Sequence, residues 1–167
     1  GPVALPVPGG VRRVSVRSAL DMREAVLAAL PGADVFIGVA AVADYRPAAA
    51  AEHKIKKSGA ELSITLTPNP DILADVASLP SPPFCVGFAA ESENLDEYAE
   101  GKRKAKKLPL IVGNLVQDGL GGDDNLVVLY DDAGRHPLPR SSKPDLARAI
   151  VAHLAGLLSQ ACIPPQP

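Results

Sequence analysis

Four short apolar runs are the feature that most limits what this chain can fold into. They read "DVFIGVA", "FCVGFAA", "LPLIVGN" and "NLVVLY", at residues 34–40, 84–90, 108–114 and 125–130. Most successive positions in each run are apolar, as in strands that are covered on both faces of a sheet. We therefore predict an α/β protein with a Rossmann-like three-layer fold, in which helices cover both faces of a mainly parallel sheet.

Capping residues between these runs predict helices at 18–30, 69–79, 94–107 and from 142 on. We also predict a short strand at 11–16, in "VRRVSV". The stretch "HKIKK" at 53–57 and the alternating stretch "LSITLTP" at 62–68 predict a hairpin that projects from the main fold. We expect this hairpin to be the one antiparallel excursion.

The composition indicates one domain and sets aside two classes of partner. The chain has 167 residues, is 47% hydrophobic and carries a formal net charge of -2, so no global field attracts it to nucleic acid or to an anionic membrane. Its two cysteines, Cys85 and Cys162, show no metal-ligand spacing. No apolar stretch approaches the roughly 18 residues of a membrane span, and no secretion signal is visible. We expect a reduced, cytoplasmic protein.

Ligands of such sheets bind beyond the carboxyl ends of the strands. At the end of the run 34–40, the small residues Ala40 and Ala41 would let a ligand approach backbone amides, and Asp44 follows three positions after Ala41. In "VGFAAES", Phe88 and Glu91 flank two alanines at a strand tip, which suits a flat base.

The third strand end, in "IVGN", carries Asn114. Lys102 and Lys106 lie one turn apart on the preceding predicted helix and could face a polyphosphate. On the predicted hairpin, Lys54, Lys56 and Lys57 repel one another unless an anion lies near.

Each of these features also has a simpler explanation. Small residues at strand ends often serve helix packing, and Asp44 could close a turn. Phe88 alone is more typical of a core residue. The run "GKRKAKK" at 101–107 is typical of a solvated helix end, and lysines on a hairpin protect sheet edges.

Other polar residues carry weaker signals. His53, His136 and His153 show no ligand spacing, so we interpret them as structural or exposed. Asp123 and Asp124 follow two glycines and indicate a loop, since the other ligand positions of a calcium site are missing.

Six motifs occur here in the order found in one enzyme family: "AAVADYRP", "KIKK", "NPDIL", "VGFAAES", "IVGN" and "LPRSSK". Over nearly its whole length the chain resembles phosphopantothenoylcysteine synthetase, above all the synthetase half of the bifunctional bacterial enzyme of coenzyme A biosynthesis. The resemblance implies a ligase that joins 4'-phosphopantothenate to L-cysteine. It implies CTP as co-substrate, an acyl-cytidylate intermediate, release of pyrophosphate and then CMP, and Mg²⁺.

The resemblance also implies roles for individual residues. Asp44 would hold Mg²⁺, Lys54 would stabilise charge on the phosphate or acyl oxygen, and Ala40 and Ala41 would line the acyl phosphate. Six further residues match nucleotide-binding positions: Phe88, Ala89 and Ala90 around the cytosine, Asn114 on the nucleotide side, and Lys102 and Lys106 at the triphosphate. The family forms a homodimer through the hairpin, here 54–68, and an upstream decarboxylase domain can accompany it.

Two departures from the family pattern stand out. Pro109 replaces a customary acidic residue. The family's glycine-rich phosphate loop and its Asn-x-Ser-Ser-Gly segment are not in this sequence, and "GPVALP" matches a point about forty residues into the family pattern. We interpret residues 1–158 as a ligase domain shortened at its amino end, favouring a fragment, and 159–167 as a frayed tail.

Three functions follow as alternatives. The first is the ligase, with ATP in place of CTP as a lesser variation. The second is a nucleotide-binding or dimerisation module without catalysis. The third, a nucleic-acid binder that uses 101–107, is disfavoured by the acidic balance and the few aromatic residues.

Overall fold

The computed structural model describes residues 5–49, 51, 53–56, 59, 61–119 and 121–161. These residues belong to two compact units. The first combines Gly1–Pro31 with Ala40–Ile72, and the second combines Gly32–Val39 with Leu73–Pro167. The central sheet lies in the second unit, and a helix and a two-stranded ribbon lie in the first.

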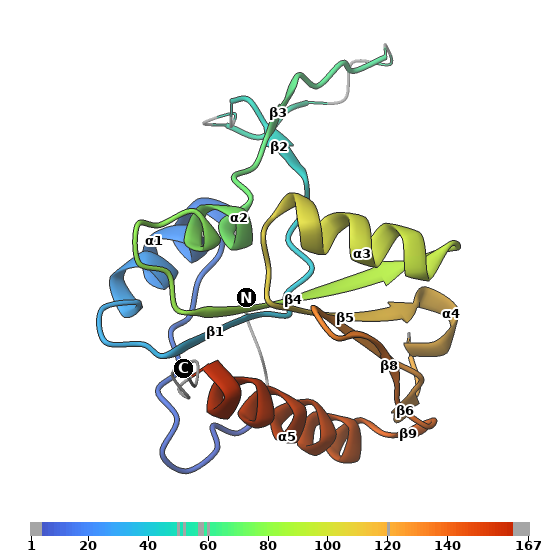
Figure 1. Cartoon of the computed structure of the whole chain (residues 1–167). Coiled ribbons are helices and arrows are strands. Elements are labelled where there is room, and N and C mark those ends of the chain that lie inside the picture. Colours follow the sequence, from blue (N-terminus) through green and yellow to red (C-terminus); the bar gives the residue numbers. More distant parts are fainter. Residues whose placement is uncertain are drawn as a thin grey trace. The chain divides into compact units, whose positions relative to one another are not determined.

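The second unit is built on a five-stranded sheet in the order β1-β4-β5-β7-β8 (Figure 1). Its parallel strands are β1 (Val35–Gly38), β4 (Phe84–Glu91) and β5 (Leu110–Leu115). Its antiparallel strands are β7 (Val128–Asp131) and β8 (Gly134–Pro137). The predicted α/β class with a mostly parallel central sheet is confirmed. The expectation of a single antiparallel excursion was wrong, because β7 reaches β5 without a crossover helix and turns straight into β8.

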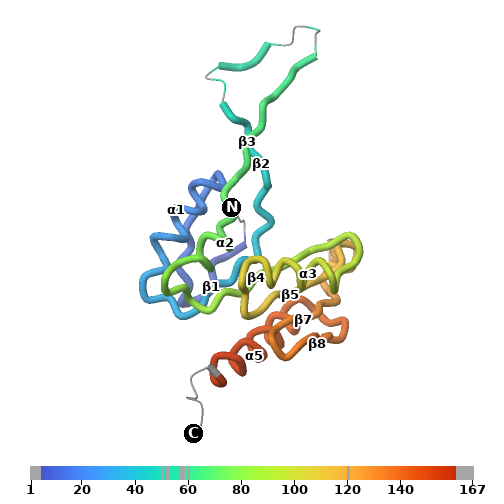
Figure 2. The backbone as a smooth tube through the Cα atoms, turned by 45° about the horizontal axis from the view of Figure 1, so that its top comes forward, coloured from blue at the N-terminus to red at the C-terminus, as the bar shows by residue number. Residues whose placement is uncertain are grey.

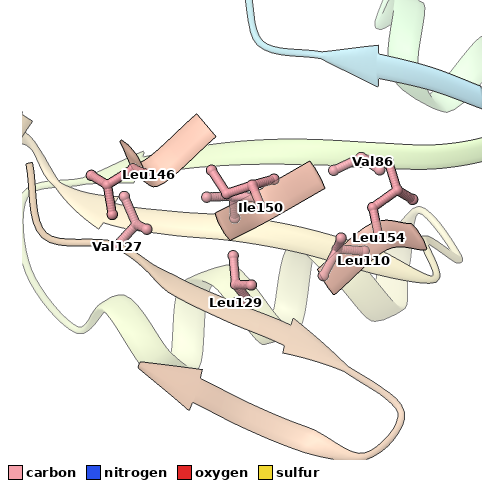
Figure 3. Packing of buried hydrophobic residues seen from close by; sticks show 8 residues of the cluster. Val86, Leu110, Val127, Leu129, Leu146, Ile150 and Leu154 are labelled. Carbon is pink, nitrogen blue, oxygen red and sulfur yellow. The ribbon is translucent and has the colours of Figure 1, made fainter. Parts of the chain in front are cut away.

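One face of this sheet packs against the long helix α5 (Lys143–Ala161), as Figures 1 and 3 show. The buried cluster contains Val86, Leu110, Val112, Val127, Leu129, Leu146, Ile150 and Leu154. Three of these residues recur every four positions along α5 and so form an apolar stripe on one face of the helix. Each fully buried leucine contributes about 2–3 kcal/mol of transfer free energy, so this face anchors the unit.

Helix α3 (Leu95–Ala105) covers the opposite face. Val112 points to α5, so Gly113 points the other way. A Cβ atom at Gly113 would lie 3.0 Å from Leu95 Cδ1 and 3.3 Å from Ala99 Cβ. The glycine therefore allows α3 to cross β5 closely, because any larger residue would push Leu95 and Ala99 aside. The two-sided covering explains why the strand sequences are apolar at successive positions.

The predicted helix starts are correct to within a few residues, but two of the predicted capping side chains make no capping bond. Asn94 is the N-cap of α3 as predicted, yet its φ is 49° and its side chain does not bond to the helix. Asn69 does not cap a helix, because α2 (Ile72–Ala77) begins three residues later. The cap predicted at Ser142 is confirmed, because its Oγ accepts a hydrogen bond from the Asp145 N–H (3.2 Å) in the first turn of α5.

Short elements complete the second unit. They are α4 (Val116–Gly119), β6 (Asp124–Asn125) and β9 (Ser141–Ser142), and β6 pairs antiparallel with β9. Asp124, predicted in a loop, thus lies in a minimal strand. Of the described residues, no helix is long and apolar enough to span a bilayer.

The first unit contains α1 (Ala19–Ala29) and a ribbon of β2 (Tyr45–Pro47) and β3 (Leu66–Pro68), traced in Figure 2. The capped helix start predicted at residue 18 is confirmed and is a capping box: Ser18 Oγ accepts from the Asp21 N–H (3.1 Å), and Asp21 accepts from the Ser18 N–H (3.0 Å). Residues 11–16 carry no strand, contrary to the prediction. They have no alternating apolar face that a neighbour could cover.

The ribbon differs from the predicted hairpin in its partner strands. β3 pairs with Tyr45–Pro47, with Arg46 opposite Thr67, rather than with the lysine stretch. Residues 53–56 and 61–65 are described and carry no strand, while Lys57 lies outside the described residues. The sequence could not fix this register, because the two strands are far apart along the chain.

Candidate functional site

The carboxyl ends of β4 and β5 form the candidate site in the second unit. The strands run parallel with Ala89 opposite Gly113 and Ala90 opposite Asn114. Ala90 is exposed and Asn114 half-buried, whereas Ala89 is buried and turned inward. β1 ends at the same edge, since Gly38 pairs with Gly87. The structure therefore brings the predicted residues Ala90 and Asn114 together at the edge where parallel sheets bind ligands.

Lys102 is held at this edge by an acidic partner. Its Nζ donates a hydrogen bond to Glu91 Oε1 at 2.6 Å, and the Glu91 side chain is 12% exposed while that of Lys102 is 50% exposed. A lysine ammonium has three donors, and this bond uses one of them. The half-exposed ammonium can thus still donate to a phosphate or carboxylate oxygen near the tip of β4.

The other two polar residues predicted here, Asn114 and Lys106, both make hydrogen bonds to backbone carbonyls. Asn114 Nδ2 donates to the Leu115 carbonyl at 2.9 Å, which orients the side-chain amide at the end of β5. Lys106 ends α3, and its backbone N–H donates to Lys102 O at 3.1 Å. It is half-buried and lies one turn beyond Lys102.

Phe88 belongs in part to the core. It is half-buried and packs against the cluster beneath α5, together with Phe84 and Val35. Its position in β4 explains this, because Phe88 lies two residues after the buried Val86 and shares its face. A role for Phe88 at a nucleotide base stays a prediction.

A cavity of about 450 Å³ opens beside the end of β5. Its lining includes Asp96 and Glu97 from the start of α3, Leu115, Asp118 and Arg135. Asp96 accepts hydrogen bonds from Tyr130 Oη and from Arg135 Nε (2.9 Å), and these bonds lower the pKa of Asp96.

Sequence reasoning missed this cavity, because the residues that line it are contributed by separate elements.

Tyr130, which donates to Asp96 beside this cavity, has a raised pKa. Burial is the larger cause, and the hydrogen bond to Asp96 adds to it. Tyr130 therefore stays a neutral donor at physiological pH.

In the first unit, the predicted residues Ala40, Ala41 and Asp44 lie on one exposed segment between β1 and β2. Asn69 anchors this segment. Its backbone N–H donates to Asp44 O (2.7 Å), and its Nδ2 donates to Ala43 O (2.8 Å).

Arg46 completes the anchor of this segment. Its Nη1 donates to Pro68 O (2.5 Å) and to Asn69 Oδ1 (3.2 Å). The motif "NPDIL" thus fixes the backbone around Asp44, and the exposed carboxylate remains able to bind a ligand.

Lys54, the last predicted residue, is exposed in the ribbon beyond β2. Four large apolar residues are also exposed by more than half: Leu66 in β3, and Ile55, Leu62 and Ile64 in the segment between the two ribbon strands. The sequence signal for this region was the alternation in "LSITLTP", of which only Leu66–Pro68 forms a strand.

Comparisons with known proteins give one consistent family. Residues 1–158 match the family model described as DNA/pantothenate metabolism flavoprotein C-terminal domain. The coenzyme A biosynthesis bifunctional protein CoaBC of Vibrio vulnificus strain YJ016 is 43% identical over 164 residues, which are 95% of this chain and 41% of that protein. CoaBC of Escherichia coli strain K12 is 46% identical over 158 residues, 90% of this chain and 39% of that protein.

A solved structure gives the same result. The crystal structure of the C-terminal domain of CoaBC superimposes with a TM-score of 0.78 at 34% identity and covers 95% of this chain and 72% of that one. Compared with the two full-length CoaBC sequences above, the chain spans about two fifths of the relatives' length.

Proposed function

Because the chain belongs to the family of the DNA/pantothenate metabolism flavoprotein C-terminal domain, we propose that it is the ligase part of a coenzyme A biosynthesis enzyme. In this role it joins 4'-phosphopantothenate to L-cysteine. The observation that carries the proposal is the strand edge of the second unit, where Glu91 holds the Lys102 ammonium beside the exposed tip of β4 and next to Asn114. Sequence similarity to CoaBC over most of the chain supports it.

The chemistry requires activation of an unreactive carboxylate. We propose that CTP supplies a cytidylyl group to the pantothenate carboxylate with loss of pyrophosphate, and that the cysteine amine then displaces CMP. Lys102 and Lys106 would bind phosphate oxygens as hydrogen-bond donors with positive charge. Asn114, whose amide is oriented by Leu115, would contact the nucleotide, and backbone groups of Ala89 and Ala90 would contact its base.

Residues of the first unit have separate roles in this proposal. Asp44 fits Mg²⁺, an ion that takes one or two carboxylates together with water and phosphate oxygens and would neutralise phosphate charge when bound. Ala40 and Ala41 present small side chains, so a phosphate or acyl group could approach their backbone closely. Lys54 would donate to an oxygen on which charge develops in the transition state.

We also propose that the protein acts in the cytoplasm as a homodimer through residues 54–68, with a decarboxylase domain as a further partner. The exposed apolar side chains of the ribbon support self-association, since exposed apolar patches of this kind mark interfaces. The run 101–107 gives little support to nucleic-acid binding, because Arg103 within it is buried and paired with Glu100.

Calorimetric titration with CTP, with and without Mg²⁺, tests the site. We expect Mg²⁺-dependent binding that Lys102→Gln weakens about tenfold, the size of one lost charge-assisted hydrogen bond of about 1.4 kcal/mol. Lys104→Gln is the matched control, because Lys104 is exposed on the same helix and pairs with Glu100 instead. Equal affinity in both variants would remove the strand edge from the proposal.

Pyrophosphate release on adding 4'-phosphopantothenate tests the chemistry, with ATP in place of CTP as the measure of nucleotide preference. Binding of CTP without pyrophosphate release would favour the non-catalytic nucleotide-binding alternative for this stretch of chain.

A further inference from the structure

A buried carboxylate lies between two imidazoles in the second unit, apart from the strand edge described above. Asp131, at the end of β7, has a side chain only 2% exposed. His136 Nε2, on β8, lies 3.0 Å from Asp131 Oδ1, and His153 Nε2, on α5, lies 2.7 Å from Oδ2. The three ligand atoms all lie within 4.8 Å of one another.

The fold brings these residues together through ordinary strand and helix periodicity. Asp131 shares a face with Leu129, two residues before it, and His136 lies directly opposite Leu129 in the β7–β8 ladder. Leu129 packs against α5, so Asp131 and His136 point to the same helix. His153 lies three residues after Ile150 and directly before Leu154, so it borders the buried stripe of α5. In Figure 2 this helix lies beside β7 and β8.

The carboxylate is fixed before any ligand arrives. The backbone N–H groups of Ala133 (2.8 Å) and Gly134 (3.2 Å) both donate to Asp131 Oδ1. These two bonds orient the buried carboxylate toward the two imidazoles.

The imidazoles remain accessible. The side chains of His136 and His153 are 36% and 24% exposed, so an ion can reach the cluster from solvent. Their ring centroids are 4.8 Å apart at an interplanar angle of 52°, so the rings are not stacked flat on each other. Both rings present Nε2 to the same carboxylate.

We propose that Asp131, His136 and His153 form a binding site for a divalent transition-metal ion, best suited to Zn²⁺. Two imidazoles and one carboxylate are a ligand set that Zn²⁺ accepts, with a fourth position left for water. Ligands about 2.1 Å from a tetrahedral ion are about 3.4 Å apart, so small side-chain movements suffice. Both Nε2 atoms must offer a lone pair, so each neutral ring carries its hydrogen on Nδ1 in the bound form.

The site differs in chemistry from the one proposed at Asp44. A hard ion such as Mg²⁺ prefers oxygen ligands, whereas two imidazole nitrogens favour Zn²⁺, Co²⁺ or Ni²⁺. An ion here would link β7, β8 and α5, and so would hold the middle of α5 to the β7–β8 hairpin. It would stabilise the fold through binding to the native state alone.

The test uses the whole chain after treatment with a chelator. Zn²⁺ is titrated against a chromophoric chelator, and thermal unfolding is followed with and without Zn²⁺. We expect one Zn²⁺ per chain, a rise in Tm with Zn²⁺, and affinity at least tenfold lower in His136→Gln and His153→Gln, because even second-shell losses cost about 10–100-fold. His53→Gln and Asp44→Asn are the matched controls and should bind Zn²⁺ as the unchanged protein does.

Co²⁺ provides a second readout. A site made of nitrogen and oxygen ligands gives visible d–d absorption without the near-ultraviolet thiolate band that Cys85 or Cys162 would produce. Equal Zn²⁺ affinity in the His136 and His153 variants, or a thiolate band, would overturn the proposal. The proposal also fails if the unchanged protein binds no Zn²⁺ and the two histidine variants have a lower Tm even with the chelator present. The cluster would then stabilise the fold through its hydrogen bonds alone.

Discussion

Arg103 offers the sharpest test of the packing around α3. It is 7% exposed in the middle of a charged run. Its guanidinium donates to both oxygens of Glu100 (2.8 and 3.0 Å), to the Leu108 carbonyl (3.2 Å) and to Asp132 Oδ1 (2.8 Å). It therefore joins α3 to the turn before β5 and to the β7–β8 turn. We predict that Arg103→Met destabilises the fold.

The magnitude follows from the exposure of each partner. The fork to Glu100, whose side chain is 28% exposed, contributes about 1–2 kcal/mol. Leu108 is buried, so loss of a donor to its carbonyl costs about 1–2 kcal/mol. Asp132 is 92% exposed, and that pair adds at most about 0.5 kcal/mol. The total is about 2–4 kcal/mol, since methionine keeps the aliphatic packing and a similar helix propensity.

Urea unfolding followed by circular dichroism measures this loss. With a slope of about 2 kcal/mol per molar, the midpoint should fall by about 1–2 M. Lys104→Met is the control, because Lys104 is 70% exposed and reaches Glu100 at 3.4 Å, so it should change stability by less than about 0.5 kcal/mol. If both variants unfold at the same urea concentration, Arg103 is not a structural residue and the reasoning fails.

Two further predictions concern charge and assembly. The hydrogen bond from Arg103 lowers the pKa of Glu100 below its ordinary value of 4.5, so its stabilisation is present above that pH and lost as the pH falls. The unfolding free energies of the unchanged protein and Glu100→Gln should therefore converge between about pH 4.5 and pH 2, and a gap that stays constant with pH would contradict this. Ile64, between β2 and β3, is 60% exposed, so Ile64→Glu should disrupt the proposed dimer and lower the sedimentation coefficient. Val151→Glu is the control, because Val151 is 55% exposed on α5, and it should leave sedimentation unchanged. A dimer through 54–68 is refuted if both variants sediment like the unchanged protein.

Much of the architecture could be read from local patterns. The four apolar runs correspond to β1, β4, β5 and β7, and the capping box at Ser18 marks the start of α1. Such signals are local, because strand burial and capping depend on residues a few positions apart. The strand-end rule also directed attention to Ala90 and Asn114, which the sheet brings side by side.

The prediction failed where a residue's partner is distant in sequence. Asn69 has the sequence of a helix cap, yet its side chain binds Ala43. The lysine stretch was paired with the wrong strand because Arg46 and Thr67, the true neighbours, are 21 positions apart. Local sequence cannot distinguish between such registers, since the choice depends on packing and turn geometry.

Local sequence patterns were therefore enough to predict the class of fold, most of the elements and the sheet edge that carries Ala90 and Asn114, because periodicity, caps and turn residues act over a few neighbouring positions. The burial of Arg103 within a charged run and the bond between Glu91 and Lys102 depend on tertiary packing instead. Tertiary packing alone brought His136 and His153, 17 positions apart, onto Asp131. These contacts arise from the packing of one element on another, so the spacing of residues along the chain does not predict them.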